Sequence, residues 1–247
     1  RVVADFYRGF IDAPITEISC LKAAEATKVI ENTFRDINIA YVNELAKSFD
    51  CLQIDLVEVI DAAKNKPFSF MAHYPGCGVG GHCIPVDPYY LIERAKKSGF
   101  NHSFLKKARA VNNSMPEYTV DLLIQRLPLI KKKLKDVKIG ILGMAYKPDV
   151  SDLRESPALE IIKILKTKKT SVLKYDPYIP QFSDVRNLDE FLEKVDVIIL
   201  ATHHKEFASM KAGKLKKHGI KIVIDGRNCL NKEEINKAGI IYKGIGR

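Results

Sequence analysis

Chemically reactive side chains are concentrated in one glycine-rich segment. The run Gly76-Cys77-Gly78-Val79-Gly80-Gly81 leads directly into His82-Cys83. Four glycines in six residues allow a ligand or another stretch of backbone to approach very closely. A lone cysteine is more often an inert core residue, but one presented on such a turn is placed to act as a nucleophile. Cys83 is therefore the candidate nucleophile.

The same letters match the dinucleotide fingerprint G-x-G-x-x-G, but their surroundings argue against that interpretation. The fingerprint works only between a strand and a helix N-terminus, where backbone amides meet a pyrophosphate. Here Pro75 precedes the glycines, and Pro85 and Pro88 prevent a helix from starting at them. We therefore predict no dinucleotide site at this loop.

A metal site is the other alternative for this segment. His73, Cys77, His82 and Cys83 lie close together in the sequence. The spacing of the two cysteines, with His and Cys adjacent, is not that of a structural zinc site, and no second ligand pair follows. We expect no metal ligands.

Three polar residues share one side of a long predicted helix. Lys28 and Asn32 are four residues apart and so lie on the same face, which Arg35 continues. They could form a solvated stripe. Alternatively, they could face a cleft opposite the cysteine loop, where an ammonium group would stabilise a developing alkoxide. The spacing alone leaves both interpretations open.

The second half carries three cations toward one edge of a predicted sheet. Lys147 and Arg154 lie in a long loop between a strand and a helix, and Arg227 follows another strand. Open α/β sheets bind their ligands at the carboxyl ends of the strands. Three cations at that edge suit a phosphorylated ligand.

The elements that position these residues fall into two groups. The first half is helical: a helix over residues 1–10, a short strand over 13–18, a long helix over 21–49 and shorter helices near 56–64, 89–98 and 103–112. The long helix carries an apolar stripe at Ile30, Phe34, Ile37, Tyr41 and Leu45, with more apolar surface than one neighbour can cover. The second half, after a helix at 118–127, alternates strands (137–143, 171–175, 195–201, 220–224) with helices (156–165, 188–194). The predicted fold is α/β: a helical domain, then a Rossmann-like, doubly wound parallel sheet.

Composition limits the classes of partner. The chain has 247 residues, a formal charge of +10 and five scattered cysteines, which indicate reduced thiols in a cytoplasmic protein rather than a disulfide framework. No stretch approaches the roughly 18 apolar residues of a membrane span, so we expect no membrane contact. The lysines are spread in short groups, which favours a small polyanion such as a nucleotide diphosphate over nucleic acid.

Three segments together resemble the UDP-glucose/GDP-mannose dehydrogenase family. They are residues 24–32 (AEATKVIEN), 78–88 (GVGGHCIPVDP) and 145–158 (AYKPDVSDLRESPA). Their order and spacing agree with the family, and the likeness covers nearly the whole chain. Val86 stands where the UDP-glucose branch carries a lysine, so the sequence of this segment is closer to the branch that oxidises UDP-N-acetylhexosamines. Within that branch the resemblance favours UDP-N-acetylmannosamine, with UDP-N-acetylglucosamine as the alternative.

The resemblance implies a two-stage oxidation of the sugar C6 alcohol to a carboxylate with NAD as cofactor. Cys83 would form a thiohemiacetal and then a thioester with the sugar. Lys28 would act on the C6 oxygen, while Asn32 and Asp87 would place and polarise water. Arg154 would reach toward NAD. The residues that would contact the UDP-sugar are Arg35, Tyr74, Gly80, Tyr146, Lys147 and Arg227.

The resemblance also implies a domain arrangement. Residues 1–20 would be the remnant of an N-terminal NAD-binding domain, 21–115 a central helical domain that forms a homodimer through its long helix, and 116–247 the UDP-sugar-binding domain. The chain begins with Arg1 and in mid-pattern, so we expect a truncated product that is inactive alone. Two other classes remain open: a UDP-sugar-binding module without turnover, and a different thiol chemistry such as acyl transfer.

Overall fold

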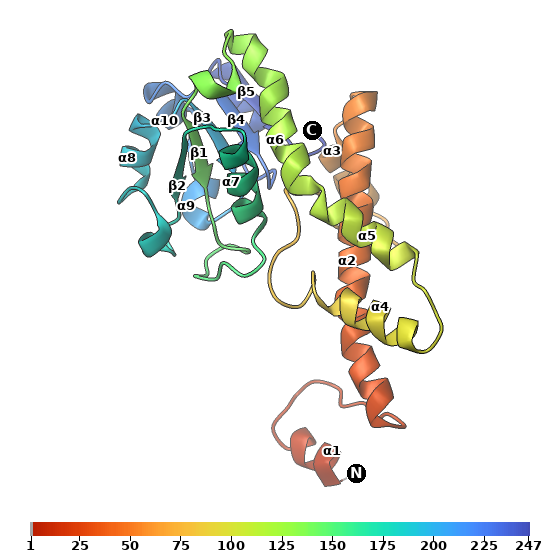
Figure 1. Ribbon diagram of the computed structural model, residues 1–247. Helices are drawn as coiled ribbons and strands as arrows, with labels where there is room; N and C mark the ends of the chain where they lie inside the picture. Colours follow the sequence, from red (N-terminus) through yellow and green to blue (C-terminus); the bar gives the residue numbers. More distant parts are fainter. Residues whose placement is uncertain (1) are drawn as a thin grey trace.

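The computed structural model describes residues 2–247 and consists of a helical part beside an α/β part (Figure 1). The helical part is built on one long helix, α2, which α4 and α5 cross and pack against. Its helices are α1 (Val2–Arg8), α2 (Leu21–Leu52), α3 (Leu56–Ala63), α4 (Asp87–Lys97) and α5 (Phe104–Asn113). The predicted helices are confirmed with small shifts of their ends. Helix α2 continues to Leu52 and stops where Gln53 adopts a left-handed conformation (φ 58°).

The buried side of α2 differs from the prediction. Ile30, Phe34 and Tyr41, from the predicted apolar stripe, are exposed in this chain. The side that packs against the rest of the chain is small or polar: Asn32, Thr33, Asp36, Ala40, Val42, Asn43 and Ala46. The periodicity identified the apolar side of α2 correctly, but within this chain the other helices pack against the opposite side of α2.

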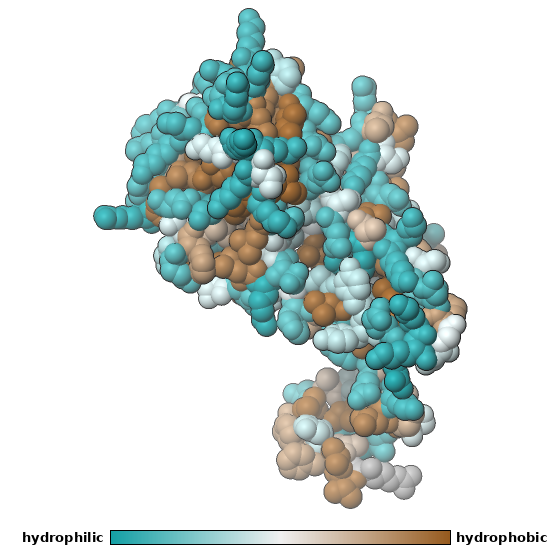
Figure 2. Space-filling view, viewed as in Figure 1, coloured by the Kyte–Doolittle hydropathy of each residue, from teal (hydrophilic) through white to brown (hydrophobic). Residues whose placement is uncertain are grey.

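The predicted strand over residues 13–18 is wrong. No strand is assigned between α1 and α2. A strand is stable only where a neighbour completes its ladder of hydrogen bonds, and every strand in residues 2–247 belongs to one sheet farther along the chain. Helix α1 exposes the apolar side chains of Val2 and Phe6, and Phe10 just after the helix is exposed too. The lower end of the molecule, where α1 lies in Figure 1, is accordingly rich in hydrophobic surface (Figure 2).

The α/β part is a parallel five-stranded sheet in the order β2-β1-β3-β4-β5, which confirms the predicted doubly wound topology. Its strands are β1 (Ile139–Leu142), β2 (Val172–Tyr175), β3 (Val197–Leu200), β4 (Ile222–Asp225) and β5 (Ile241–Gly244). Leu142, Tyr175, Leu200 and Asp225 align in register, so the loops that follow them share one edge. The sequence analysis did not identify β5.

Helices cover both faces of the sheet. The helices and short 3-10 turns of this part are α6 (Met115–Arg126), η1 (Leu127–Ile130), η2 (Leu134–Asp136), α7 (Pro157–Thr167), η3 (Pro180–Phe182), α8 (Leu188–Glu193), α9 (Lys205–Ala208), α10 (Ala212–Lys217) and α11 (Lys232–Lys237). Ile139 and Ile141 face one core, with Leu123 of α6 and Ile161 of α7. Leu142 and alternate residues of the central strands face the other, which is closed by Phe191, Phe207, Leu215 and Ile235.

Contacts between the two parts fix how the helical part meets the sheet. Asp50 of α2 accepts a hydrogen bond from Tyr118 of α6 and pairs with Lys243 of β5. Nearby, the amide of Leu56 donates to the carbonyl of Gly246 over 2.8 Å. A side chain at Gly246 would collide with Ala46 of α2. The glycine therefore lets the end of the chain lie directly against the long helix.

Candidate active site

A cavity of about 260 Å³ lies where the glycine loop meets the carboxyl edge of the sheet. One wall comes from α2 and from the glycine loop. The other comes from the loops after β1, β3 and β4, the position where parallel sheets bind ligands. The residues used below are Arg35, Tyr74, Gly80, Ile84, Tyr146, Lys147, Thr202, His203 and Arg227. All six predicted substrate-binding residues, which are far apart in the sequence, thus line one cavity.

The cavity is electropositive. Arg35, Lys147 and Arg227 line it, and no Asp or Glu is found among the described residues of its walls. Arg227 is held in place, because its Nε donates to the carbonyl of Ala201 over 2.8 Å and its backbone amide donates to Asp225 Oδ1 over 3.0 Å. Fixed cations in a concave site attract a polyanion such as a diphosphate.

The glycines of the loop are required because another segment of the chain, around Tyr146 and Glu155, lies very close to it. A Cβ at Gly80 would lie 2.7 Å from the carbonyl oxygen of Glu155 and 2.8 Å from Cβ of Tyr146. Gly81 has a φ of +90°, and its amide donates to the carbonyl of Arg154 over 2.9 Å. The loop therefore lies directly against the segment that bears Tyr146 and Lys147, and any larger residue would separate them.

The structure distinguishes the two cysteines of the loop. Cys77 is fully buried, with its Sγ 3.4 Å from the carbonyl oxygen of Ala201, and burial raises the pKa of its thiol. Cys83 is exposed, next to Ile84 of the cavity wall. Only an accessible thiol can reach a substrate, so Cys83 fits a nucleophile and Cys77 fits a packing role.

Asn32 and Asp87 come together from distant parts of the chain. Asn32 Nδ2 donates to Asp87 Oδ2 over 2.6 Å, and Asn32 is 4% exposed. The backbone amide of Asp87 donates to the carbonyl of Cys83 over 2.8 Å at the start of α4. A carboxylate and an amide are thus paired one backbone turn away from the candidate nucleophile Cys83.

Lys28 and Arg154 are less constrained. Lys28 lies one turn before Asn32 on α2, but its ammonium pairs with Glu31 at 3.0 Å and its side chain is 66% exposed. It does not line the cavity. Arg154 is exposed and pairs with Asp152 at 2.6 Å. Hydrogen bonds to Asp152 are the main reason that the pKa of Arg154 is raised.

A buried polar network beneath the glycine loop was not identified from the sequence. Asp36 of α2 pairs with Arg109 and accepts from Asn112 Nδ2 over 2.8 Å, and Asn43 Nδ2 donates to Asn112 Oδ1 over 2.9 Å. Asn43 Oδ1 then accepts the amide of Gly76 over 2.9 Å. The network joins α5 and α2 to the start of the loop. The available signal was the spacing of Asp36 and Asn43, which are seven residues apart and so share one face of α2, but the sequence does not say that this face is buried.

His203 is a second feature that the sequence analysis missed. It follows β3 and lines the cavity beside Arg227. His203 is exposed on one side, and the partial desolvation of its ring, followed by the positive charge of Arg227, lowers the pKa of His203. Its place directly after a buried strand, at the same edge as Lys147 and Arg227, was the available signal.

Two domain profiles of one family match the chain. The central domain of the UDP-glucose/GDP-mannose dehydrogenase family matches residues 22–114, and its UDP binding domain matches residues 140–232. The chain belongs to this family. The first match contains Asn32, Cys83 and Asp87, and the second contains Lys147 and Arg227.

Relatives and solved structures agree with this assignment. The chain is 38% identical over 244 residues to a UDP-N-acetyl-D-mannosamine dehydrogenase of Pyrococcus horikoshii. The aligned residues cover 98% of this chain and 56% of that protein. A structure of UDP-D-ManNAc dehydrogenase from P. horikoshii superposes with a TM-score of 0.90 at 36% identity, over 100% of this chain and 57% of that one. A structure of an NDP-N-acetyl-D-galactosaminuronic acid dehydrogenase from Methanosarcina mazei superposes with a TM-score of 0.83 at 34% identity, over 91% of this chain and 51% of that one. The chain spans about half the length of the curated relatives it matches.

The described residues offer neither a cluster of metal ligands nor a helix suited to a membrane. Within residues 2–247, no group of three His, Cys, Asp or Glu side chains is arranged to hold a metal ion. None of the helices in that range combines the length and apolarity needed to cross a bilayer.

Proposed function

We propose that this chain supplies the substrate-binding and cysteine-bearing half of a UDP-N-acetyl-D-mannosamine dehydrogenase, with the gluco epimer as the alternative substrate. The observation that carries the proposal is the electropositive cavity of Arg35, Lys147 and Arg227, which lies beside the exposed Cys83. In this proposal residues 21–115 form the catalytic helical domain and residues 116–247 bind UDP.

The cavity explains how a UDP-sugar would be oriented. The diphosphate would lie against Lys147 and Arg227, Tyr74 and Tyr146 would enclose the nucleotide, and Arg35 would approach from α2. All five line the same cavity. The closely packed Gly80 brings the loop that ends at Cys83 directly against the segment of Tyr146, so the thiol would lie near the sugar end of the ligand.

The chain's own residues support two covalent steps. The Cys83 thiolate would add to the C6 aldehyde, forming a C–S bond and a hydroxyl, with Lys28 as the proton donor or charge partner of that oxygen. Lys28 would have to leave Glu31 for this role. At the end, Asp87 would take a proton from a water that attacks the thioester, and the C–S bond would break to release the carboxylate and the thiolate. Asn32 holds one oxygen of Asp87 in place for that transfer.

We propose that the main NAD site is formed by protein outside this chain. A dinucleotide pyrophosphate binds where a glycine-rich turn opens directly into a helix. The loop at 76–81 leads instead through a turn to α4 at Asp87, and after β1 a long segment precedes α7. Arg154 is the one residue we propose to reach toward NAD. In the two oxidations, the hydride acceptor would therefore be held mainly by protein outside this chain.

We further propose a homodimer formed through α2. The side of α2 that this chain leaves exposed carries Ile30, Phe34 and Tyr41. Beside it lies a mainly apolar groove of about 400 Å³ between α2, α3 and the segment of Phe70 and Met71. An unpartnered apolar surface along so long a helix fits a self-complementary two-fold contact. The five free cysteines favour a reducing, cytoplasmic location.

Calorimetry with UDP and with each UDP-N-acetylhexosamine tests the binding proposal directly on this chain. Lys147→Ala should weaken UDP binding about tenfold, because a charge-assisted contact to phosphate is lost. Lys166→Ala, an exposed lysine of α7 away from the cavity, is the matched control and should bind as the unchanged chain does. Absence of UDP binding at millimolar concentration, or equal binding by the Lys147 variant, would refute the proposal.

A further inference from the structure

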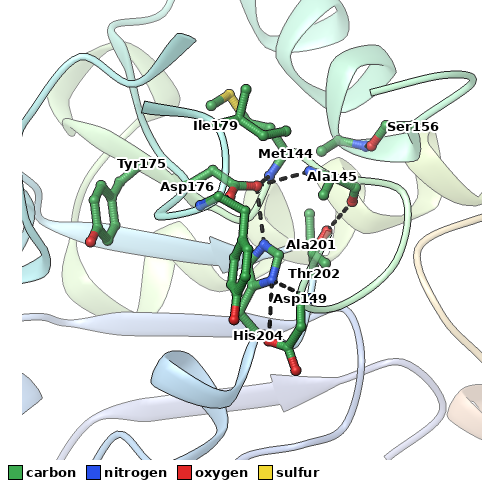
Figure 3. Close-up of polar contacts among 12 residues, drawn as sticks. Met144, Ala145, Asp149, Ser156, Tyr175, Asp176, Ile179, Ala201, Thr202 and His204 are labelled. Carbon is green, nitrogen blue, oxygen red and sulfur yellow. Dashed lines mark hydrogen bonds and ion pairs between the residues drawn. The ribbon is translucent and has the colours of Figure 1, made fainter. Parts of the chain in front are cut away.

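The segment that carries Tyr146 and Lys147 into the cavity is anchored at its first residues by a buried carboxylate. Asp176, directly after β2, is fully buried. Its Oδ2 accepts the amide of Met144 over 2.6 Å and that of Ala145 over 2.9 Å (Figure 3). The start of the segment is thus fixed to the end of the neighbouring strand.

The other end of the segment is anchored by a histidine. The backbone amide of Asp149 donates to Nδ1 of His204 over 2.8 Å. A backbone amide can only donate, so Nδ1 must carry the lone pair and the ring hydrogen must be on Nε2. That Nε2 lies 3.1 Å from Asp176 Oδ2 and donates to it. The contacts therefore define the tautomer: a neutral ring that bridges Asp176 and Asp149.

The bridge is enclosed and has little freedom to rearrange. His204 is fully buried, and Tyr178 stacks on its ring with centroids 4.7 Å apart. The hydroxyl of Thr202 donates to the carbonyl of Ala145. Burial alone would raise the pKa of Asp176, but hydrogen bonds from His204 and from the amides of Ala145 and Met144 lower it, so the group remains an acceptor.

Asp149 shows why an anchor is needed at that end. Its φ is +59°, in the left-handed region that side chains other than glycine rarely adopt. The bond from the Asp149 amide to His204 helps to hold this conformation, together with the bond from the amide of Lys205 to Asp149 Oδ1 at 3.2 Å. Between the two anchors lie only Tyr146, Lys147 and Pro148, all of which line the cavity.

We propose that His204 is a positioning residue of the UDP-binding cavity, whose neutral Nε2–H ring couples Asp176 to Asp149 and thereby sets the places of Tyr146 and Lys147. The proposal rests on the proposed function for the identity of the ligand. A purely structural role in the core would make stability depend on His204. It would not make the placement of the segment depend on which ring nitrogen is replaced.

Two substitutions separate the nitrogens. In His204→Asn the amide oxygen takes the place of Nδ1, so the acceptor for Asp149 is kept and the contact with Asp176 is lost. In His204→Gln the amide nitrogen takes the place of Nε2, so the donor to Asp176 is kept and Asp149 loses its acceptor. His218→Gln is the matched control, because His218 follows α10 and lies beside Asp189, away from the cavity.

The first readout is hydrogen exchange of the Asp149 amide in the unliganded chain, measured by NMR. We expect this amide to exchange at least tenfold faster in His204→Gln, and within about threefold of the unchanged rate in His204→Asn. UDP binding by calorimetry should follow the same order, about tenfold weaker for Gln and little changed for Asn. Urea unfolding of each variant shows whether their stabilities are comparable.

Equal exchange rates for Asp149 in the Asn and Gln variants would overturn the proposal. So would a tautomer with the hydrogen on Nδ1 of His204, which ¹⁵N NMR of the imidazole detects in the unchanged protein and which requires no variant to fold. Failure of the unchanged chain to bind UDP would refute the proposed function instead. The exchange and tautomer measurements report on His204 in either case.

Discussion

The side-chain amide of Asn32 donates to the carboxylate of Asp87 over 2.6 Å, although 55 positions separate the two residues. The contact joins the long helix α2 to the first turn of α4. The amide of Asp87 is also bonded to the carbonyl of Cys83, so the backbone positions of these two residues are fixed relative to one another. A base and a nucleophile held in this way can act in succession on one carbon atom.

Asp87→Asn should block hydrolysis of the thioester in a full-length protein that contains this chain, because an amide cannot take a proton from water. We expect a sugar adduct on Cys83 to accumulate, and intact-protein mass spectrometry of samples quenched during turnover would detect it. Cys83→Ser should abolish the thioester adduct, whereas Cys77→Ala should leave it unchanged. An adduct that maps to Cys77 would contradict the proposed mechanism.

Alkylation should distinguish the two cysteines of the loop. Iodoacetamide near pH 7 should label Cys83 quickly and Cys77 at least tenfold more slowly, because Cys77 is fully buried and burial raises the pKa of its thiol. Peptide mapping by mass spectrometry gives both rates in one sample. UDP-sugar should protect Cys83 but not the exposed Cys20, which serves as the internal control. Equal rates for Cys83 and Cys77 would show that the loop opens in solution.

UDP binding should be accompanied by proton uptake at His203. Partial desolvation and the charge of Arg227 lower the pKa of His203 in the unliganded cavity, so the ring is neutral near pH 7. A bound diphosphate offsets the neighbouring positive charge and should raise that pKa, so a proton is bound as UDP enters. Calorimetry near pH 6 with a UDP-sugar, whose phosphates carry no proton that titrates in this range, in buffers of different ionisation enthalpy measures this uptake. His203→Gln should remove it, and His218→Gln should retain it.

The lowered pKa of His203 should also affect how the free energy of unfolding depends on pH. The unfolded chain binds a proton on His203 more readily than the folded chain does, since the unperturbed pKa is about 6.5. The contribution of His203 to stability is therefore fully present above that value and is lost as the pH falls through the folded pKa. Urea unfolding should accordingly show a smaller loss of stability on acidification in His203→Gln than in the unchanged chain. An equal loss in both would contradict the assignment.

Tyr41→Glu should dissociate the proposed dimer. Tyr41 is 57% exposed on the uncovered side of α2, so a charge there can remain in water in the single chain but would be buried unpaired between two copies. Sedimentation velocity should show a dimer for the unchanged chain and a monomer for the variant. Lys166→Ala, on α7, should leave the dimer intact. A monomer for the unchanged chain at micromolar concentration would refute the α2 interface.

The sequence by itself determined the features that depend on local signals. The alternation of buried strands with helices predicted the parallel sheet, because each element's hydrophobic period is contained within its own residues. The crowding of glycines before Cys83 indicated close approach of another segment, and Gly80 against Tyr146 confirms it. The position of Lys147 and Arg227 after strands placed both cations at one sheet edge, because parallel strands end together.

Only the tertiary structure decided which side of α2 is buried and how the site is supported. Asp36 and Asn43 are buried because Arg109, Asn112 and the amide of Gly76, from distant segments, satisfy them. The bridge from Asp176 through His204 to Asp149 likewise joins the ends of three separate loops. Such polar groups can be buried only where each partner meets the other's hydrogen-bonding capacity, and the sequence does not specify those pairings before the chain folds.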